Sequence, residues 1–146
     1  FMQGLIQRVR QANVVIDQEA VGAIDQGILL LLGVEQGDDQ AKADKLLHRV
    51  INYRIFADAE GKMNRSLLDV NGGLLVVSQF TLAADTRKGM RPSFSSAAVP
   101  DASKKLYDYF LQQASQRLVS LQSGRFGADM AVTLTNDGPV TFLLKV

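Results

Sequence analysis

The sequence from Gly72 to Phe94 reads GGLLVVSQFTLAADTRKGMRPSF. Its two glycines lead into residues 74–77, a short apolar run behind a turn signal, which predicts a buried strand. Residues 78–81, SQFT, then place three hydrogen-bonding side chains around one aromatic ring. A buried strand that delivers polar groups to its carboxyl end and opens into a loop often carries a functional site. The alternative is that these side chains only satisfy neighbouring backbone groups.

A charged loop follows, and it contains the tightest basic cluster of the chain, Arg87, Lys88 and Arg91. The whole sequence has a formal net charge of only +1 at pH 7. Proteins that hold long nucleic acids by charge alone are usually far more basic. Two interpretations of the cluster therefore stay open: a solvated loop, or a local patch that grips the end of an RNA.

The composition is that of an ordinary globular protein. The 146 residues are 47% hydrophobic and 21% charged, and we expect residues 1–146 to form a single domain. The absence of cysteine excludes disulfides, thiolate nucleophiles and thiolate metal sites. No apolar run approaches the roughly 18 residues that span a bilayer, and no signal-peptide pattern appears. We therefore expect a soluble cytoplasmic protein, and we expect Phe1, which precedes Met2, to be a remnant of cloning.

Three strands and one helix are predicted before the glycine pair. Residues 39–51 place apolar side chains at three- and four-residue spacings, which predicts an amphipathic helix with Asp38 or Asp39 at its N-cap. Residues 28–34 form a fully apolar run, so both faces of that strand should be covered. The other two predicted strands are residues 3–16 and 20–24.

His48, the only histidine, lies within the predicted helix. No serine, cysteine or acidic partner stands near it in sequence, so we interpret it as a partly exposed structural residue. A metal site needs several convergent ligands, and one histidine with scattered carboxylates does not indicate one. We expect neither a metal nor a cofactor.

The second half of the chain begins with a long irregular segment, residues 84–99. A helix is predicted from Ala102 to Leu121, with Asp101 at its N-cap. Two alternating strands follow, at residues 131–135 and 140–144, and the residues between them, Asn136-Asp137-Gly138-Pro139, predict a hairpin turn. Pro139 is a candidate for a cis peptide. The predicted order is β-β-β-α-β-α-β-β.

Two motifs together resemble those of the D-aminoacyl-tRNA deacylases. They are SQFT at 78–81 and Gly138-Pro139-Val140-Thr141, with GMRPSF at 89–94 between them. The sequences YRIF at 53–56 and GRF at 124–126 extend the similarity to nearly the whole chain. The resemblance implies a homodimer with a three-layer α/β/β fold, made of mixed, largely antiparallel sheets and two helices.

The implied activity is hydrolysis of the ester that joins a D-amino acid, or achiral glycine, to the 3′-terminal adenosine of tRNA. The Gly138–Pro139 peptide would be cis and would reach into the partner's pocket, where rigid backbone atoms exclude an L side chain whatever its chemistry. Arg8 matches a residue that helps to fix this loop. The resemblance further implies that the aminoacyl-adenosine pocket is lined by Ser78, Gln79, Phe80 and Thr81, with Phe126 and Met130 near the adenosine.

Two chemical routes remain open. Thr81 could act as the nucleophile, but the sequence shows no base that would activate it. Alternatively, the 2′-hydroxyl of the substrate assists, and the N–H groups of Phe80 and Thr81 polarise the ester carbonyl. We prefer the second route. Two other functions compete with hydrolysis: a non-catalytic RNA-end or nucleotide-binding module, and a purely structural dimerisation domain.

Overall fold

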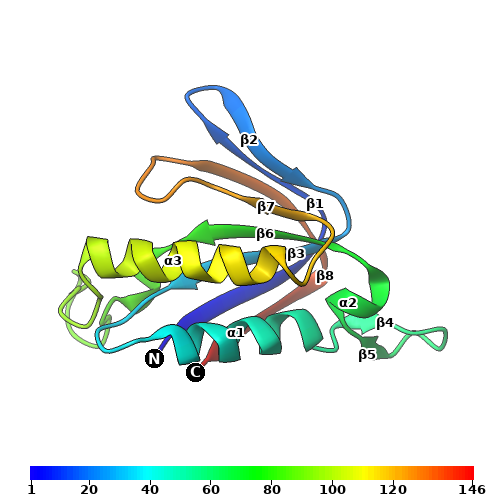
Figure 1. The fold of residues 1–146 in the computed structure, drawn as a ribbon, viewed down its shortest axis with the longest axis horizontal. Helices are drawn as coiled ribbons and strands as arrows, with labels where there is room; N and C mark the ends of the chain where they lie inside the picture. The colour runs from blue at the N-terminus through cyan, green and yellow to red at the C-terminus, as the bar shows by residue number, and fades with distance from the viewer.

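A computed structural model describes residues 1–146 (Figure 1). The chain forms one large sheet, a two-stranded sheet, three α-helices and a 3₁₀ turn. The elements in chain order are β1 (Gln3–Ile16), β2 (Glu19–Ile24), β3 (Gly27–Gly33), α1 (Gln40–Asn52), β4 (Phe56–Ala57), β5 (Met63–Arg65), α2 (Leu67–Val70), β6 (Gly73–Ser78), η1 (Phe80–Ala83), α3 (Pro100–Ser115), β7 (Leu121–Ser123) and β8 (Ala131–Lys145).

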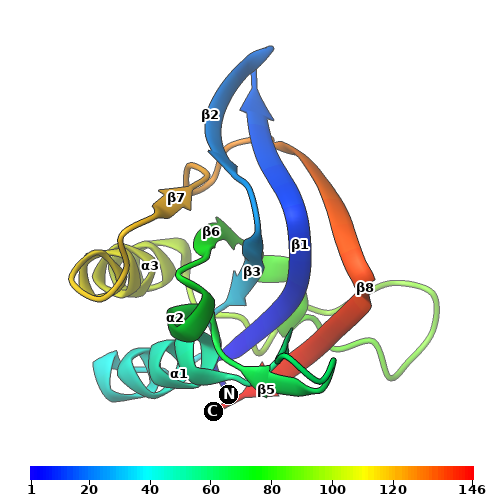
Figure 2. The same cartoon turned by 90° about the vertical axis from the view of Figure 1, so that its right-hand side faces the viewer.

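The long strand β1 organises the large sheet. It pairs antiparallel with β2, β3 and β8, whereas β3–β6 and β6–β7 are parallel pairs. The order is β2-β1-β3-β6-β7, with β8 on the other side of β1. The sheet curves strongly, and α1 and α3 cover one side of it (Figure 2). This confirms a mixed, largely antiparallel α/β fold.

The middle strands β3 and β6 separate two cores. Successive side chains of a strand point to opposite faces, and here both faces are buried. Leu30 and Val76 belong to the core beneath the helices, whereas Leu29 and Leu75 belong to a second core inside the curved sheet. Val14 of β1 closes that second core. The stacking of helices, middle strands and curved strands gives the expected three layers.

Two glycines allow β3 and β6 to start side by side. Gly27 pairs with Gly73 in the parallel register. A Cβ atom on Gly27 would lie 1.9 Å from the main-chain oxygen of Gly73. Only glycine fits such a close backbone approach. The glycines therefore fix the spacing of the strands that lead to residues 78–81.

Helix α1 forms as the spacing predicts. The Asp39 carboxylate accepts a hydrogen bond from the Lys42 N–H at 2.9 Å and so caps the first turn. The side chains that face the core are Ala43, Leu46, Leu47, Val50 and Ile51. His48 is exposed on the opposite face, with Asn52 as its neighbour. None of the helices has both the length and the apolar character needed to cross a membrane.

The prediction for the second helix is wrong at both ends. Helix α3 has Val99 at its N-cap and Pro100 as its first residue, and it ends at Ser115. Leu121 fits the helical spacing of the apolar residues, but the chain turns back before it. Leu121 instead pairs with Leu74 in β7, an edge strand parallel to β6. The helix is therefore shorter, and the sheet gains a strand.

The predicted hairpin at residues 136–139 is also wrong. Both halves of the region belong to one strand, β8, which runs antiparallel to β1. Gln7 pairs with Thr141 and Val9 with Asn136, so residues 137–140 form a bulge rather than a reversal. The Asn136 side chain accepts a hydrogen bond from the Val140 N–H at 3.0 Å, which closes the bulge. The Gly138–Pro139 peptide is cis.

Candidate active site

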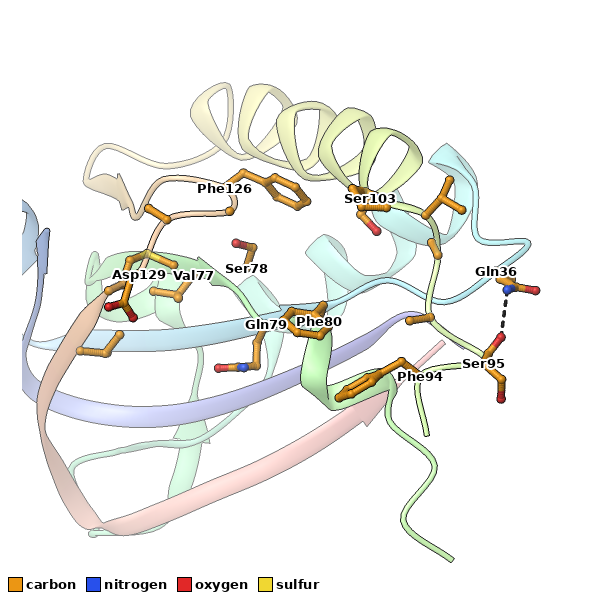
Figure 3. A pocket seen from close by; sticks show the side chains of 18 residues that line it. Gln36, Val77, Ser78, Gln79, Phe80, Phe94, Ser95, Ser103, Phe126 and Asp129 are labelled. Atoms are coloured by element: carbon orange, nitrogen blue, oxygen red, sulfur yellow. Dashed lines mark hydrogen bonds between the residues drawn. The ribbon is translucent and has the colours of Figure 1, made fainter. Parts of the chain in front are cut away.

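A pocket of about 760 Å³ opens where β6 ends (Figure 3). Most of it is built by the end of β6 with the start of η1, the end of the 84–99 loop, the start of α3 and the connector after β7, and the turn after β3 and the start of β8 add one residue each. Figure 3 shows Phe126 and Phe80 on opposite sides of the pocket, with Ser78 between them. The lining residues are Gln36, Val77, Ser78, Gln79, Phe80, Phe94, Ser95, Ala97, Ala98, Val99, Pro100, Ser103, Phe126, Gly127, Ala128, Asp129, Met130 and Val132.

The first turn of the 3₁₀ helix η1 leaves two hydrogen-bond donors free, one on Phe80, which lines the pocket, and one on the next residue. The Gln79 N–H donates a hydrogen bond to the Leu32 carbonyl at 2.8 Å, and this bond continues the pairing of β6 with β3. The N–H groups of Phe80 and Thr81 come next, at the first turn of η1, where a helix has no internal acceptors. Neither group donates a hydrogen bond in the structure. Two adjacent free N–H groups can stabilise an oxyanion.

The aromatic ring of Phe80 is 61% exposed, which is unusual for a large apolar side chain. It packs against Phe94, with ring centroids 5.2 Å apart. Phe94 ends the GMRPSF stretch and is itself 41% exposed. These two rings form an apolar wall that solvent reaches.

Thr81 does not line the pocket with the rest of SQFT. Its hydroxyl accepts a hydrogen bond from the Gln79 side-chain amide. An amide is not a base, so this contact does not activate the hydroxyl. Among the residues that line the pocket, Asp129 is the single ionisable one. Sequence reasoning missed Asp129, because one acidic residue in a connector carries no pattern.

Tyr107 of α3 holds the connector that carries Phe126 and Met130. Its buried hydroxyl lies 3.2 Å from the carbonyl oxygens of both Val76 and Gly124. Its ring packs against Phe126, with centroids 5.8 Å apart. Burial raises the pKa of Tyr107 to about 12, so the hydroxyl remains a hydrogen-bond donor.

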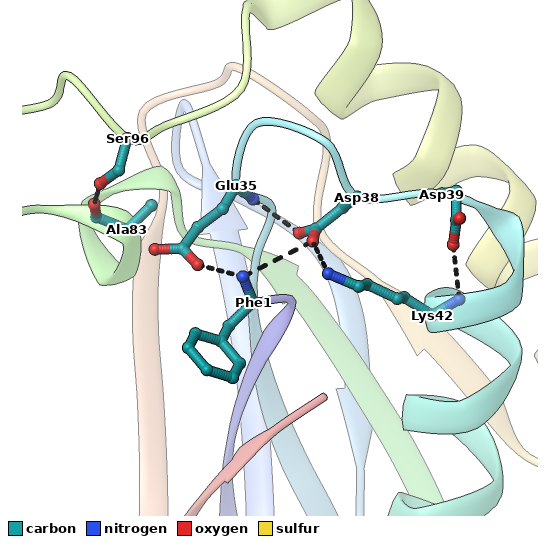
Figure 4. A network of polar contacts seen from close by, with 7 residues as sticks. All are labelled: Phe1, Glu35, Asp38, Asp39, Lys42, Ala83 and Ser96. Atoms are coloured by element: carbon teal, nitrogen blue, oxygen red, sulfur yellow. Dashed lines mark hydrogen bonds and ion pairs between the residues drawn. The ribbon is translucent and has the colours of Figure 1, made fainter.

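The 84–99 loop is irregular, as predicted, and it is tied down at both ends. Asp85 and Ser93 exchange two main-chain hydrogen bonds, which close the projecting tip between them (Figure 2). The Ser96 hydroxyl donates to the Ala83 carbonyl at 2.8 Å (Figure 4). The Gln36 side chain donates to the Ser95 carbonyl at 2.9 Å. These contacts fix the pocket wall and leave the tip exposed.

The polar contacts around Asp38 hold the turn that carries Gln36 (Figure 4). The Asp38 carboxylate accepts hydrogen bonds from the Glu35 N–H at 2.7 Å and from the Lys42 ammonium at 3.2 Å. The ammonium of Phe1 lies 2.5 Å from the Glu35 carboxylate. This turn is therefore fixed from two sides.

The three basic residues of the loop tip are not equivalent. Arg87 forms a bidentate ion pair with Asp85, with N–O distances of 2.9 and 2.8 Å. These hydrogen bonds lower the pKa of Asp85 to about 2. Lys88 and Arg91 are exposed and form no ion pair. None of the three lines the pocket.

The Gly138–Pro139 loop lies away from the pocket of its own chain. Both residues are exposed, and neither lines the pocket. Arg8 supports the loop from β1: its Nε donates to the Asp137 carbonyl at 3.0 Å, and its Nη1 donates to the Ile55 carbonyl at 2.7 Å. The structure thus brings Ser78, Gln79, Phe80, Phe126 and Met130 together and leaves Arg8, Gly138 and Pro139 as a second group.

The sequence profile of a family described as D-Tyr-tRNA(Tyr) deacylase matches residues 5–145. The chain belongs to the D-aminoacyl-tRNA deacylase family. A protein of Stutzerimonas stutzeri named D-aminoacyl-tRNA deacylase is 65% identical over 144 residues, covering 99% of both chains. A protein of the same name from Haemophilus ducreyi is 62% identical over 145 residues, covering 99% of this chain and all of that one.

Two solved structures resemble this member of the deacylase family. One, described as c-Myc DNA unwinding element binding protein, has a TM-score of 0.94 and 35% identity, covering 99% of this chain and 98% of that one. The other is described as a probable eukaryotic D-amino acid tRNA deacylase. It has a TM-score of 0.84 and 16% identity, covers 99% of both chains, and shows that the fold is shared.

Proposed function

We propose that the chain hydrolyses the ester bond of D-aminoacyl-tRNA, and of glycyl-tRNA mischarged on a non-cognate tRNA. The products are the free amino acid and tRNA, and L-aminoacyl esters are spared. Membership of the deacylase family supports the reaction. The observation that carries the site is the free N–H group of Phe80, which lines the pocket, followed by the free N–H group of the next residue, Thr81. Charged tRNA is used in the cytoplasm, where we place the activity.

The size and lining of the pocket support an aminoacyl-adenosine as its ligand. A volume near 760 Å³ lies within the usual range for small-molecule sites. We assign Phe126 and Met130 to the adenosine, because they supply an apolar surface on one wall. We assign Ser78 and Gln79 to polar contacts with the aminoacyl ester. Phe80 contributes its N–H group and its exposed ring.

Water is the nucleophile in this proposal. It attacks the ester carbonyl, and the negative charge that develops on the carbonyl oxygen is stabilised by the N–H groups of Phe80 and Thr81. A donor of this kind is worth about 3–4 kcal/mol in other enzymes. The bond between the carbonyl carbon and O3′ then breaks, and O3′ takes the proton that the attacking water loses. The neighbouring 2′-hydroxyl of the substrate relays this proton from the water to O3′, because no side chain around Thr81 can do so.

Thr81 is a positioning residue in this proposal. Its hydroxyl holds the Gln79 side chain through the hydrogen bond described above. Its place outside the pocket lining supports this assignment over the nucleophilic one.

We also propose a homodimer in which Gly138 and Pro139 complete the pocket of the partner. Two observations support it: both residues are exposed, and they do not reach the pocket of their own chain. Phe142 and Leu143, close by on β8, are 38% and 46% exposed and suit an interface. Backbone atoms of the loop would then exclude the side chain of an L-amino acid.

The loop tip contributes to tRNA binding through Lys88 and Arg91. The Asp85 carboxylate neutralises Arg87, so we expect Arg87 to contribute least of the three. Neutralising Lys88 should weaken tRNA binding and flatten its salt dependence by about one unit of slope.

A second candidate is a non-catalytic nucleic-acid-binding module. It is favoured by the relative whose name describes a DNA-binding protein and which is 35% identical to this chain. The test is whether purified protein releases free D-tyrosine from D-tyrosyl-tRNA. Release that depends on enzyme concentration supports the deacylase, whereas tRNA binding without release supports the second candidate.

A further inference from the structure

A second pocket lies beside the Gly138–Pro139 loop. Its volume is about 440 Å³, and it shares no lining residue with the larger pocket. Its charged residues are Arg8, Arg65 and Asp137, from β1, β5 and β8. Phe56 and Val70 add an apolar wall. Five separate elements, β1, β4, β5, α2 and β8, therefore converge on one polar pocket that the proposed reaction does not use.

The side chains in and beside this pocket carry more positive than negative charge. The Nε and Nη1 groups of Arg8 are held by neutral carbonyl oxygens, so these hydrogen bonds do not cancel its charge. The Asp137 carboxylate is shared between two guanidinium groups, at 3.5 Å from Arg8 and 3.4 Å from Arg10. Arg65 donates to the main-chain oxygen of Asp69 at 3.0 Å and forms no ion pair.

This arrangement suits a phosphate. Arginine presents a planar fork of N–H donors that matches phosphate oxygens, and it binds them through charge-assisted hydrogen bonds. Arg8 is held rigidly, with its side chain 15% exposed, whereas Arg65 is exposed at the rim and can reach a ligand. Phe56 and Val70 offer an apolar surface to a sugar beside the phosphate.

We propose that this pocket binds a backbone phosphate of the single-stranded acceptor end of tRNA. The proposal rests on the proposed function, including the dimer. In that dimer, Gly138 and Pro139 enter the partner's larger pocket, so the Arg8–Arg65 pocket lies at the rim of the site that holds the aminoacyl-adenosine. The phosphate that precedes the adenosine leaves the active site past this surface. Each active site would thus take its adenosine from one subunit and its phosphate contact from the other.

Arg65 provides the test, because it touches no part of the proposed catalytic machinery. The variants are Arg65→Gln, Arg65→Lys and, as a matched control, Lys62→Gln, an exposed cation on the same hairpin that does not line the pocket. Affinity for uncharged tRNA is measured over a range of salt concentrations, so the result does not depend on catalysis. Thermal unfolding confirms that each variant is folded.

We expect Arg65→Gln to weaken tRNA binding about fivefold to tenfold, the scale of one charge-assisted hydrogen bond. The slope of log affinity against log salt should fall by about 0.7 to 1. Arg65→Lys should recover part of the loss, and Lys62→Gln should stay within about twofold of the wild type. Unchanged affinity in Arg65→Gln, or an equal loss in Lys62→Gln, overturns the proposal.

A second substrate separates this proposal from the proposed function. D-tyrosyl-adenosine carries the ester but no phosphate, so its hydrolysis should be the same in Arg65→Gln and in the wild type. With D-tyrosyl-tRNA, the variant should raise KM and leave kcat unchanged, which is the signature of lost ground-state binding. An equal loss with both substrates contradicts the phosphate site. Failure of the wild type to hydrolyse either ester contradicts the deacylase function instead, and the binding measurement still decides the phosphate site.

Discussion

The guanidinium of Arg8 donates a hydrogen bond to the main-chain carbonyl of Asp137 at 3.0 Å, and so ties β1 to the bulge of β8 just before Gly138. The same side chain donates to the Ile55 carbonyl at 2.7 Å. A Cβ atom on Gly138 would lie 3.2 Å from Nη2 of Arg8, so the loop is packed closely against it. Arg8 therefore determines where the exposed Gly138–Pro139 loop lies.

Arg8→Gln should lower the free energy of unfolding by about 2–3 kcal/mol, because it leaves the two carbonyl groups without their charged donor. D-aminoacyl-tRNA hydrolysis should fall more than about tenfold as the loop shifts. Urea unfolding and initial rates measure the two effects. Arg10→Gln is the control: its side chain is 73% exposed with one contact at 3.4 Å, so it should cost less than about 0.5 kcal/mol. Equal effects of the two variants would argue against the role of Arg8.

Gly27→Ala should be severely destabilising, by about 3 kcal/mol or more, because the added methyl group collides with the Gly73 backbone rather than with a movable side chain. Gly37→Ala tests the alternative that any alanine in place of glycine is harmful. That position has open space and a positive φ of 83°, so it should cost only about 1–2 kcal/mol. Comparable unfolding midpoints for the two variants would contradict the close approach of β3 and β6.

Tyr107 should make stability fall in alkali. The pKa of its hydroxyl is about 12 in the folded chain, because of burial, against 10.0 when exposed. Between these values the folded chain keeps a proton that the unfolded chain releases, so stability falls as pH rises. The loss should reach roughly 2 kcal/mol by pH 12.

Tyr107→Phe should remove that alkaline loss. At pH 7 it should lower the free energy of unfolding by about 1 kcal/mol, because the variant lacks the hydrogen bond of the hydroxyl. Urea unfolding of both proteins at pH 7 and at pH 9 to 12 measures the difference between their free energies of unfolding. The titration of the lysines and of the other tyrosines contributes equally to both proteins and cancels. Parallel pH curves would show that the Tyr107 hydroxyl is not desolvated as described.

Thr81→Val tests the choice between the two chemical routes. It should lower kcat by about tenfold to a hundredfold, the scale of one or two hydrogen bonds, since the Thr81 hydroxyl only positions Gln79 and the Thr81 N–H is retained in the variant. Thr86→Val, an exposed loop threonine, is the control and should have no effect. The tRNA that ends in 2′-deoxyadenosine and carries a D-amino acid at O3′ should be hydrolysed far more slowly than its ribose counterpart. A dead Thr81→Val enzyme together with near-normal hydrolysis of the deoxy ester would instead indicate a threonine nucleophile.

The elements that the sequence predicts well are those whose pattern is determined locally. Residues 28–34 and 74–77 are apolar on both faces, and β3 and β6 are indeed covered on both sides. The spacing of Leu46, Leu47 and Val50 similarly predicts α1. Here the local periodicity and the tertiary packing agree.

The errors arise where tertiary pairing overrides a local signal. Leu121 continues a helical spacing by chance, but its place beside Leu74 in the sheet decides its structure. Asn136 to Pro139 resemble a hairpin turn, yet both flanks pair with β1, and the Asn136 side chain closes a bulge. A turn signal alone does not distinguish a bulge from a reversal.

The site was predicted only in part. Ser78, Gln79 and Phe80 line one pocket with Phe126, whereas Thr81 lies outside its lining, and the roles that the resemblance implies for these residues stay predictions. The neutralisation of Arg87 by Asp85 requires the loop geometry. The pocket of Arg8 and Arg65 was not predicted. These residues are far apart in sequence and share no pattern, so only the folded chain, in which β1, β5 and β8 line one pocket, brings them together.

The enantiomer ratio tests the central claim most directly. Purified protein is incubated separately with D-tyrosyl-tRNA and L-tyrosyl-tRNA at equal concentration, and the loss of each ester is measured against a protein-free control. The account predicts hydrolysis of the D-ester in proportion to the enzyme, with the L-ester decaying at its uncatalysed rate. Equal hydrolysis of both esters, or of neither, would contradict it.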